Sequence, residues 1–478
     1  MGLVFRVLDP VPIRSLDEYV DLGGGGKALA AARGVEPVAV IEVVEASGLR
    51  GRGGAGFPTG TKWRTVAGMG GAEPTTVVVN AAEGEPGTLK DRTLLRRNPY
   101  KVLEGALIAA HAVAADRIVV GMKASATRER ARLEEAIGEV RRAGWAEGIA
   151  IDVVAASDRY LLGEETALLE VIAGRPPFPR VAPPYRHGAE EVGADVTAPA
   201  TTALADPDGA TSAPATLVNN VETLANVPSI VLDGPDALRA LGTTESPGTI
   251  VCTVSGRMER AGVDEFELGT PLREVLATLG GNALGKEIVA VLSGTANPLL
   301  PAAALDAPLS WEGLAAAGGG LGAAGFIVID DEVDLVAVAQ GVSRFLSVES
   351  CGQCTPCKQD GLTLAEVLDR LRTSSPDEGD LDALPALTAS VTDGARCFLA
   401  QQHQLVVESL LVEFPEALAA HAEGRAAAAD PFPIVPLADI VDGQAVLADE
   451  ELEVAPDWSV GADSGAAPAD RLDVRARR

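Results

Sequence analysis

Four cysteines in one pattern constrain this chain more than any other feature of its sequence. Cys351, Cys354 and Cys357 follow one another with two residues between neighbours, and Cys397 comes 40 residues after the third. Three thiolates at this spacing can ligate one face of a cuboidal iron–sulfur cluster, and a distant fourth can ligate the remaining corner. The pattern therefore predicts that these residues bind one [4Fe–4S] cluster and that the chain transfers electrons.

Zinc is the alternative metal, because four thiolates also form structural zinc sites. Such sites usually use two pairs of cysteines, so three cysteines in one run with a remote fourth fit the cluster better. Pro356, inside the run, is expected to keep it from forming regular helix. The fifth cysteine, Cys252, lies in the apolar segment VCTVSG and is expected to be a core residue.

The charge balance limits the partners of the chain. It has 39 basic and 68 acidic residues, a net charge of −29, and such a surface repels nucleic acid and anionic membranes. The N-terminus does not resemble a signal peptide, and no run of about 18 apolar residues lacks charge. We therefore expect a cytoplasmic chain without direct membrane insertion, in which cysteines are more often metal ligands or catalysts than disulfides.

Segments typical of strands and helices alternate through the first part of the chain. Thr75–Val79, Arg117–Gly121 and Ile149–Val154 are strand-like, with helical patterns around Asn98–Ala115 and Thr127–Ala143 between them. This alternation predicts an α/β domain with a largely parallel sheet over residues 1–244. Within it, residues 186–215 are rich in Ala, Asp, Pro, Gly and Thr, and are expected to form a solvated surface insertion.

The remaining chain divides into three smaller parts. Residues 245–332 hold short β-rich runs around one helix near Pro271–Leu279, which favours a small mixed domain. Residues 333–428 show helical periodicity and contain the four-cysteine pattern. Residues 429–478 are rich in Pro, Ala and Asp and are expected to form a tail.

A glycine-rich segment, SGLRGRGGAGFPTGTKW, covers residues 47–63. Glycines let backbone N–H groups approach a phosphate or a flavin closely. The segment is no Walker loop, because no Ser or Thr follows Lys62, and no clear strand leads into it as in a Rossmann fold. A flexible surface loop would not explain Phe57 and Trp63 beside basic side chains, so the segment favours nucleotide or flavin binding. Three basic residues supply its positive charge: Arg50, Arg52 and Lys62.

Three further segments complete a family pattern: NAAEGEPGTLKDR at 80–92, YLLGEETAL at 160–168 and LVNNVETLANVP at 217–228. Together with GLRGRGGAGFPTGTKW and ESCGQCTPCK, they closely resemble the NADH-oxidising flavoprotein subunit of respiratory complex I. The same family includes the diaphorase subunits of NAD-linked hydrogenases and formate dehydrogenases. The resemblance covers about residues 20–425, with the motifs in the family's order.

The resemblance implies a fold and a reaction. An α/β FMN-binding domain, unlike the usual Rossmann fold, would be followed by a ubiquitin-like β-grasp domain and a C-terminal helical bundle with the iron–sulfur cluster. NADH would pass a hydride to FMN, which would release single electrons to the [4Fe–4S] cluster. The electrons would leave to a thioredoxin-like [2Fe–2S] subunit of a larger redox complex, which could hold this chain at the inner face of a membrane.

Residue roles follow from the matching positions. The FMN phosphate is expected against Asn219–Thr223, at the start of a helix. No general acid or base is expected, because hydride transfer is direct. The expected FMN contacts are Gly51, Gly53, Lys62, Asn80, Glu83, Tyr160, Gly163, Glu164, Asn219, Asn220 and Thr223. The expected NAD(H) contacts are Gly54 and Ala55 for close approach, Phe57 for stacking on adenine, Glu85 and Glu165 for the sugar or nicotinamide, and the aromatic Tyr185. The alternative roles are a solvated helix start for Glu164 and Glu165, a helix cap for Asn219 and Asn220, and a core position for Tyr160.

Four positions depart from the family pattern. Ala82 stands for an Asp that would hydrogen-bond near the flavin, Gly84 for a Ser, Thr65 for an aromatic and Ala182 for a Lys. These changes and the 186–215 insertion identify a divergent member of the family. Two functions therefore stay open besides a cofactor-poor assembly subunit: an NADH:acceptor flavoprotein, and an electron relay that keeps flavin and cluster without using NADH.

Overall fold

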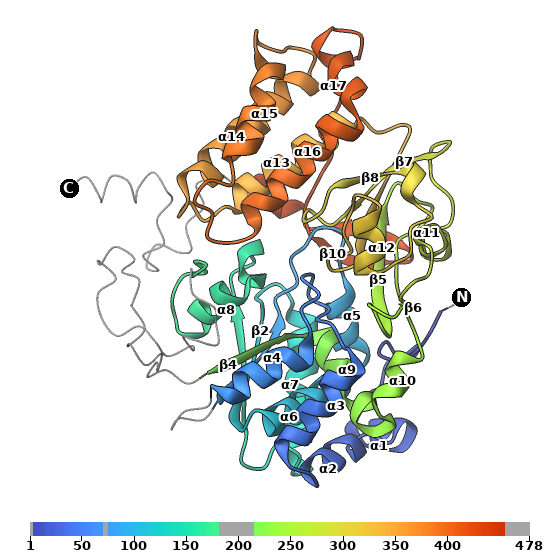
Figure 1. Ribbon diagram of the computed structural model, residues 1–478, viewed down its shortest axis with the longest axis vertical. Helices are drawn as coiled ribbons and strands as arrows, with labels where there is room; N and C mark the ends of the chain where they lie inside the picture. The colour runs from blue at the N-terminus through green and yellow to red at the C-terminus, as the bar shows by residue number, and fades with distance from the viewer. Residues whose placement is uncertain (1–2, 70–74, 181–214, 455–478) are drawn as a thin grey trace, which may run out of the picture.

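The computed structural model describes residues 3–69, 75–180 and 215–454. Three units lie along the long axis of the molecule (Figure 1): an α/β unit at the bottom, a second sheet beside and above it, and a group of helices at the top. The segments with cofactor-binding motifs lie in the first and third units. No helix in the described ranges is long and apolar enough to cross a lipid bilayer.

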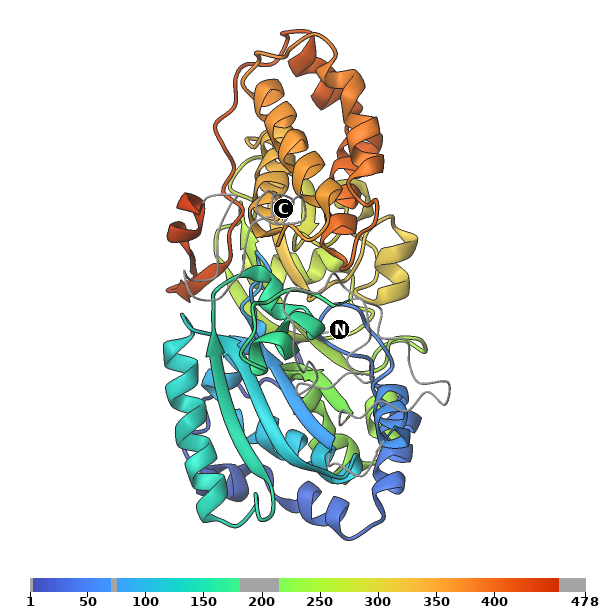
Figure 2. The same ribbon diagram turned by 90° about the vertical axis from the view of Figure 1, so that its left-hand side faces the viewer.

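The first unit is built on a four-stranded sheet in the order β3-β2-β1-β4, with every pair of neighbours parallel. Figure 2 shows the strands running side by side in the lower half of the molecule. Its strands are β1 (Thr75–Ala81), β2 (Ala115–Lys123), β3 (Ala150–Ala156) and β4 (Thr216–Asn220). The parallel sheet and its three predicted strands are therefore confirmed.

Both faces of this sheet are covered, which explains why its central strands are apolar on both sides. Val77 and Val79 of β1 belong to one large core, whereas Val78 belongs to a smaller core with Leu162 and Leu168. The larger core includes α6 (Pro99–Ala112) and α9 (Val221–Asp233). These two helices approach each other so closely that a side chain at Gly105 would collide with the backbone of Leu224. The other helices of the unit are α1 (Leu16–Gly23), α2 (Lys27–Arg33), α3 (Pro37–Ser47), α4 (Thr59–Gly68), α5 (Lys90–Arg97), α7 (Thr127–Arg142), η1 (Tyr160–Gly163), α8 (Glu165–Ile172) and α10 (Pro235–Arg239).

The second unit is a five-stranded mixed sheet in the order β6-β5-β9-β7-β8. Its strands are β5 (Thr249–Gly256), β6 (Gly262–Glu267), β7 (Ile288–Ser293), β8 (Leu299–Pro301) and β9 (Gly325–Asp330). The helical segments are α11 (Leu272–Gly280), η2 (Ala302–Ala304) and α12 (Trp311–Ala316). Cys252 lies fully buried in β5, as expected for a core cysteine.

The third unit is helical, as its periodicity predicted. It contains α13 (Leu335–Glu349), α14 (Thr355–Arg372), α15 (Asp380–Ser390), α16 (Leu399–Glu413) and α17 (Pro415–Ala422). Its apolar core continues into the neighbouring units, because Leu292 and Ile327 of the second sheet and Leu161 of the first unit belong to it. Shared packing of this kind fixes the three units relative to one another.

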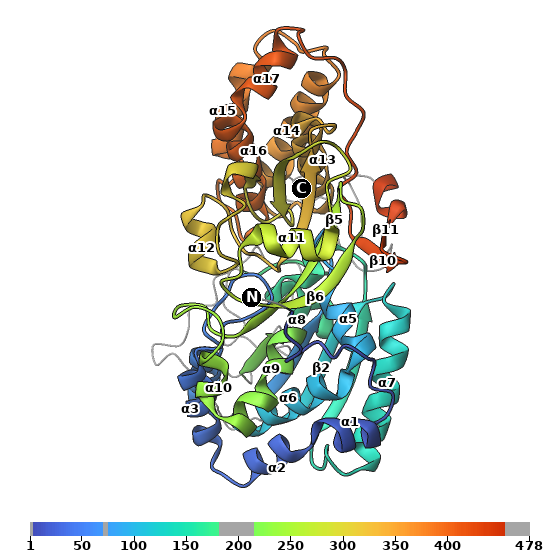
Figure 3. The same cartoon turned by 90° about the vertical axis from the view of Figure 1, so that its right-hand side faces the viewer.

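The segment expected as a tail from residue 429 contains regular structure in its described part. A β-hairpin of β10 (Leu437–Val441) and β11 (Gln444–Leu447) precedes η3 (Asp449–Glu453). Figure 3 shows the segment descending from the helices along the side of the molecule. It is anchored by burial of Ile434, Val435 and Leu437 and by an ion pair of Asp439 with Arg96 of α5. The predicted insertion, 186–215, lies outside the described residues apart from its last position.

Candidate functional site

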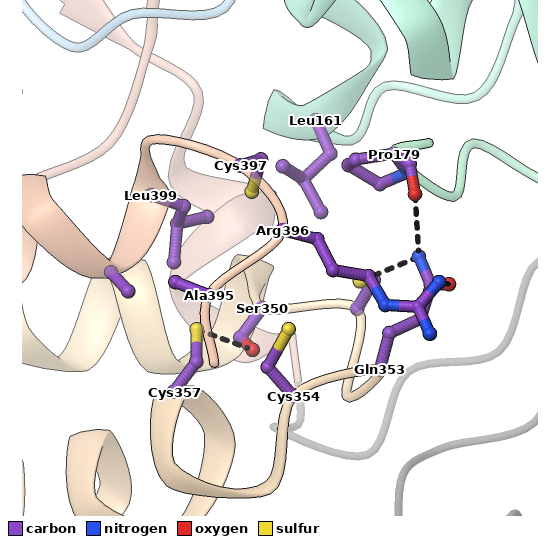
Figure 4. Close-up of a pocket in the computed structure, with 12 residues that line it drawn as sticks. Leu161, Pro179, Ser350, Gln353, Cys354, Cys357, Ala395, Arg396, Cys397 and Leu399 are labelled. Carbon is purple, nitrogen blue, oxygen red and sulfur yellow. Dashed lines mark hydrogen bonds between the residues drawn. The ribbon is translucent and has the colours of Figure 1, made fainter. Parts of the chain in front are cut away.

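The four predicted cluster ligands line one cavity in the third unit (Figure 4). Cys351 follows α13, Cys354 caps the N-terminus of α14, Cys357 lies in the first turn of that helix, and Cys397 lies just before α16. The tight turn after Cys351 uses Gly352, whose φ of 78° is in the left-handed region. Two residues of the first unit, Leu161 and Pro179, complete the wall.

The thiols of this cavity are shielded from water. Burial raises the pKa of Cys357 to about 11 and that of Cys397 to about 12, and it also raises the pKa of Cys351. Such thiols stay protonated unless a metal replaces the protons. Polar groups already face two of the sulfurs: the Ser350 hydroxyl lies 3.3 Å from the Cys357 Sγ, and the Gln353 amide donates to the Cys351 Sγ over 3.5 Å.

The four thiols line one cavity but do not converge on a single point. Within the described residues, no three His, Cys, Asp or Glu side chains converge closely enough to hold one metal ion, although all four cysteines line the same cavity. A tetrathiolate zinc site would bring the sulfurs together around one point. The residues therefore fit a cuboidal cluster, whose irons would each take one thiolate.

Pro356 does not keep the cysteine run from forming helix, and this expectation is wrong. The helix α14 begins at Thr355, so Pro356 lies in its first turn. Proline is tolerated there because the N–H that it lacks would have no partner within the helix. The N-terminus of the helix therefore points its free N–H groups and positive dipole end toward the cavity, which suits an anionic thiolate-ligated cluster.

The glycine-rich segment folds back on itself and contacts the end of β4. The backbone N–H of Gly51 donates to the Phe57 carbonyl over 2.8 Å, and the N–H of Arg52 donates to the Thr223 hydroxyl over 2.8 Å. A Cβ added at Gly53 would lie 3.2 Å from the Asn220 Cβ, tighter than ordinary contact. The tip of the loop is thus a backbone cradle beside the start of α9, which fits a phosphate-bearing ligand.

The two arginines of the loop hold it to the second unit instead of facing a ligand. Arg50 and Arg52 stack on the Trp311 ring at 4.6 and 5.1 Å from its centroid. Arg52 is completely buried and donates to the carbonyls of Arg50 and Pro247, and burial lowers its pKa to about 10. The expectation that these two side chains supply the positive charge of a binding site is therefore wrong for Arg52, whose charge serves the loop's own anchorage.

Hydrogen bonds between distant segments bring the predicted flavin contacts together. The Asn80 amide, at the end of β1, donates to the Gly163 carbonyl over 2.8 Å. The Trp63 indole donates to the side-chain oxygen of Asn219 over 2.7 Å. Because β1 and β4 are parallel neighbours, their carboxyl ends meet at one edge, where ligands of open α/β sheets bind.

Several of the predicted contact residues also cap the N-termini of helices. Glu83 accepts the N–H groups of Asp91 and Arg92 at the start of α5, and burial together with the Asp91 carboxylate raises its pKa to about 7. Glu164 accepts the N–H of Ala167 and caps α8. Asn220 likewise caps α9 by accepting the N–H of Glu222 over 3.0 Å. The capping role anticipated for Asn220 is present, and it places these polar groups at one rim of the sheet.

The residues predicted to contact the nucleotide differ in whether their side chains already have partners within the protein. Phe57 is 54% exposed at the loop surface, available for stacking. Lys62 and Glu165 form an ion pair with each other. The Glu85 carboxylate is half-buried and accepts from the Tyr160 hydroxyl and from the backbone N–H and hydroxyl of Thr295. Tyr185, like the altered position Ala182, lies outside the described residues.

Four contributors to this region had no role assigned from the sequence. Lys90 and Asp91 stood inside the NAAEGEPGTLKDR motif, where Lys90 forms ion pairs with both Asp91 and Glu222, and an ion pair could have been suspected from the mixed charges. Thr295 and Gln402 gave no sequence signal, because each reaches the Glu85–Tyr160 pair from a different unit of the fold.

Comparison with known families covers both cofactor regions. Residues 44–229 match the family model described as the Nuo51 FMN-binding domain, and residues 337–421 match that of the NADH-ubiquinone oxidoreductase-F iron–sulfur binding region. The first contains the glycine-rich loop and the Asn219–Thr223 segment, and the second contains all four cavity cysteines.

Individual relatives align over nearly the whole chain. The second F-type subunit of the NADH-quinone oxidoreductase of Rhizobium meliloti is 34% identical over 438 residues, 88% of this chain and 99% of the relative. The F-type subunit of the Mycobacterium tuberculosis enzyme is 36% identical over 430 residues, 87% of this chain and 92% of the relative. A crystal structure of an NAD+-reducing [NiFe]-hydrogenase in the H2-reduced state aligns with a TM-score of 0.72 and 31% identity, over 91% of this chain and 68% of that chain. The chain therefore belongs to the family of FMN- and [4Fe–4S]-containing NADH dehydrogenase flavoproteins that includes the F-type subunits of NADH-quinone oxidoreductase.

Proposed function

We propose that this chain binds FMN at the shared edge of β1 and β4 and passes electrons from NADH through the cysteine cavity to a partner subunit. The phosphate would lie at the start of α9, against the loop tip at Gly53 and Gly54. The flavin ring would extend toward Asn80 and Gly163. When bound, FMN accepts a hydride from NADH and releases electrons singly, which the nicotinamide cannot do.

One observation carries the proposal: adjacent residues belong to the two cofactor regions. Tyr160 stands in the flavin motif and bonds to Glu85, whereas Leu161 lines the cysteine cavity. A backbone step of one residue therefore separates the wall of one site from the wall of the other. The arrangement supports direct transfer between two cofactors held in one rigid, buried frame.

The protein residues act by binding and orientation. Phe57, exposed at the loop surface, would stack on the adenine of NADH, and Ala55 and Gly54 would leave room for the dinucleotide. Lys62 and Glu165 would have to open their ion pair to reach the ligands. Gly51, Glu83, Glu164, Asn219, Asn220 and Thr223 would shape the FMN side, and Glu85 and Tyr185 the NADH side.

The architecture supports finer assignments. The five-stranded sheet with α11 would be a ubiquitin-like β-grasp domain at residues 245–332, and α13–α17 would be the helical bundle at 333–428. A thioredoxin-like [2Fe–2S] subunit would receive the electrons in a larger, cytoplasmic redox complex. The homologous NADH-quinone oxidoreductase and hydrogenase subunits support this assembly.

The relay that no longer uses NADH is the second candidate. Thr65, where the family often has an aromatic residue, donates back to the Thr61 carbonyl within α4 and offers no stacking surface. Ala82 likewise brings no carboxylate to the flavin edge.

Anaerobic titration tests the proposal. The holoprotein, with flavin and iron quantified, receives NADH or NADPH while the flavin band is followed. Rapid bleaching by NADH with a much slower response to NADPH is expected. A flavin that dithionite reduces but NADH does not would contradict NADH oxidation and support the relay. Phe57→Ala should raise the KM for NADH while flavin content stays unchanged, whereas Phe432→Ala, far from the loop, should leave the KM unchanged.

A further inference from the structure

A partly buried hydrogen-bond network joins the three units between the two cofactor regions. Glu85, from the motif after β1, accepts through one oxygen from Thr295 and through the other from the Tyr160 phenol. The phenol oxygen in turn accepts from the side-chain amide of Gln402 over 3.0 Å. Thr295 belongs to the second unit and Gln402 to α16 of the third, so each unit supplies a member.

The network is built into the packing of the fold. Gln402 is buried, and the Tyr160 ring contacts Phe345 of α13 edge-on, with 5.3 Å between ring centroids. Gly294 has a φ of 62°, and any side chain there would collide with the Glu85 carboxylate. The backbone therefore leaves room for this carboxylate at a point where a larger residue would exclude it.

The donors and acceptors of the network settle the direction of its bonds. A phenol has one proton, and the Glu85 carboxylate is the strongest acceptor within reach. The phenol oxygen is then left to accept, and the Gln402 N–H lies 3.0 Å from it; the Gln402 carbonyl oxygen at 3.2 Å and the Thr295 hydroxyl are the other polar groups beside the phenol. If the Gln402 amide were lost, the phenol could turn away and leave the half-buried Glu85 carboxylate with fewer donors.

We propose that Gln402 is a positioning residue of the flavin site: its amide directs the Tyr160 proton to Glu85 and so holds the Tyr160 side chain in place against the bound flavin. The inference rests on the proposed function, because it assumes that FMN lies beside Tyr160. It means that the flavin site is complete only when α16 of the iron–sulfur unit is docked on the first unit. Gln402 makes no contact with substrate in this role and acts through Tyr160.

Three variants test this role in the holoprotein. Gln402→Leu removes the amide, and Gln402→Glu replaces the donor with a second acceptor. Gln404→Leu is the matched control, because Gln404 lies on the same helix and donates to the Thr388 carbonyl over 3.0 Å, away from the flavin motifs. The readouts are the FMN dissociation constant by fluorescence, the flavin midpoint potential, the melting temperature and the EPR spectrum of the reduced cluster.

Gln402→Leu is expected to weaken FMN binding about tenfold, the size of one hydrogen bond in a charged network, and to shift the midpoint potential. Gln402→Glu should have the larger effect, while Gln404→Leu should bind FMN like the wild type. The cluster EPR spectrum should stay the same in all three. If Gln402→Leu lowers the melting temperature but keeps the wild-type FMN affinity and midpoint potential, Gln402 only stabilises the packing of the units, and the proposal is overturned.

A double-mutant cycle with Tyr160→Phe tests whether Gln402 acts through the phenol. The double variant should bind FMN as Tyr160→Phe alone does, because the phenol oxygen that Gln402 supports is already gone. Effects that multiply would overturn the assignment. If the wild-type protein binds no FMN, both the proposed function and this inference are overturned. If the wild type binds FMN and the Gln402→Leu variant binds it with the same affinity and midpoint potential, only the inference is overturned.

Discussion

The indole nitrogen of Trp63 donates a hydrogen bond of 2.7 Å to the side-chain oxygen of Asn219. Trp63 is fully buried in α4, directly after the glycine-rich loop, and Asn219 is the penultimate residue of β4. Because the oxygen is engaged, the amide N–H groups of Asn219 are fixed on the opposite side. The bond thus orients one donor of the proposed flavin site.

We expect Trp63→Phe to weaken FMN binding about fivefold to tenfold, because it removes this bond while keeping an aromatic ring in the core. Fluorescence titration of the flavin-stripped protein measures the change. Trp145→Phe, on the far side of the first unit, is the control and should bind FMN normally. Equal affinities for both variants would contradict an orienting role for Trp63.

The sequence predicted the parts of this site that depend on local pattern. The family resemblance placed Asn80 and Asn219 in one flavin site before the structure was known, but β4, which brings Asn219 beside β1, was not among the predicted strands. The cysteine spacing similarly predicted a shared cavity. The constraint on the first three cysteines lies within a short segment, whereas the pairing of β1 with β4 joins segments that are far apart in the sequence.

Long-range partners could not be predicted in this way. Tyr160 and Gln402 are 242 residues apart, and no periodicity relates them. Arg52 was expected only to add positive charge to the glycine-rich segment, because the Trp311 ring that it stacks on lies in a different unit. The hairpin near the C-terminus was missed although Asp442-Gly443, with φ of 50° and 76°, is a common hairpin turn pair.

The cysteine assignment predicts different outcomes for substitutions at Cys397 and Cys252. Cys397→Ala should lose the cluster EPR signal and most of the iron, because one iron would lack its protein ligand. Cys252→Ala, in the core of the second sheet, should retain both. Iron analysis and EPR of the reduced proteins compare them. Full iron content in the Cys397 variant would show that this residue is not a ligand.

Lys90 holds two buried carboxylates at the rim of the sheet. Its Nζ lies 2.7 Å from Asp91 and 3.0 Å from Glu222. Burial lowers the pKa of Lys90, but the two carboxylates more than offset this effect and hold the pKa above its ordinary value. Lys90→Met would leave the fully buried Glu222 without its ion-pair partner and with only the weaker effect of Arg52, so we expect a loss of about 3–5 kcal/mol in the free energy of unfolding.

Urea unfolding measures this loss. The exposed Lys286 offers a matched Lys→Met control, which should change the free energy of unfolding by less than about 0.5 kcal/mol. A Lys90 variant as stable as that control would mean that Glu222 takes up a proton at no measurable cost.

His403 predicts a pH-dependent stability. It is buried in α16 beside Gly361, where a Cβ would lie 3.2 Å from its ring, and neither ring nitrogen has a hydrogen-bond partner within the described part of the chain. Burial lowers its pKa to about 4 from the ordinary 6.5. Between pH 6.5 and pH 4 the His403 imidazole is protonated in the unfolded chain but neutral in the folded protein. His403 therefore lowers the free energy of unfolding as the pH falls below about 6.5.

His403→Leu removes this proton uptake and two unpaired buried nitrogens. Relative to the wild type, the variant should therefore gain about 2 kcal/mol more unfolding free energy at pH 5 than at pH 7.5, since one pKa unit corresponds to about 1.4 kcal/mol. Anaerobic urea unfolding of the cluster-loaded proteins at both pH values measures the two differences. If the gain were the same at pH 5 and pH 7.5, His403 would have to be protonated inside the fold, and a partner for its ring would have to exist. A gain that grows only at the acidic value instead identifies the neutral, unpartnered imidazole as the cause.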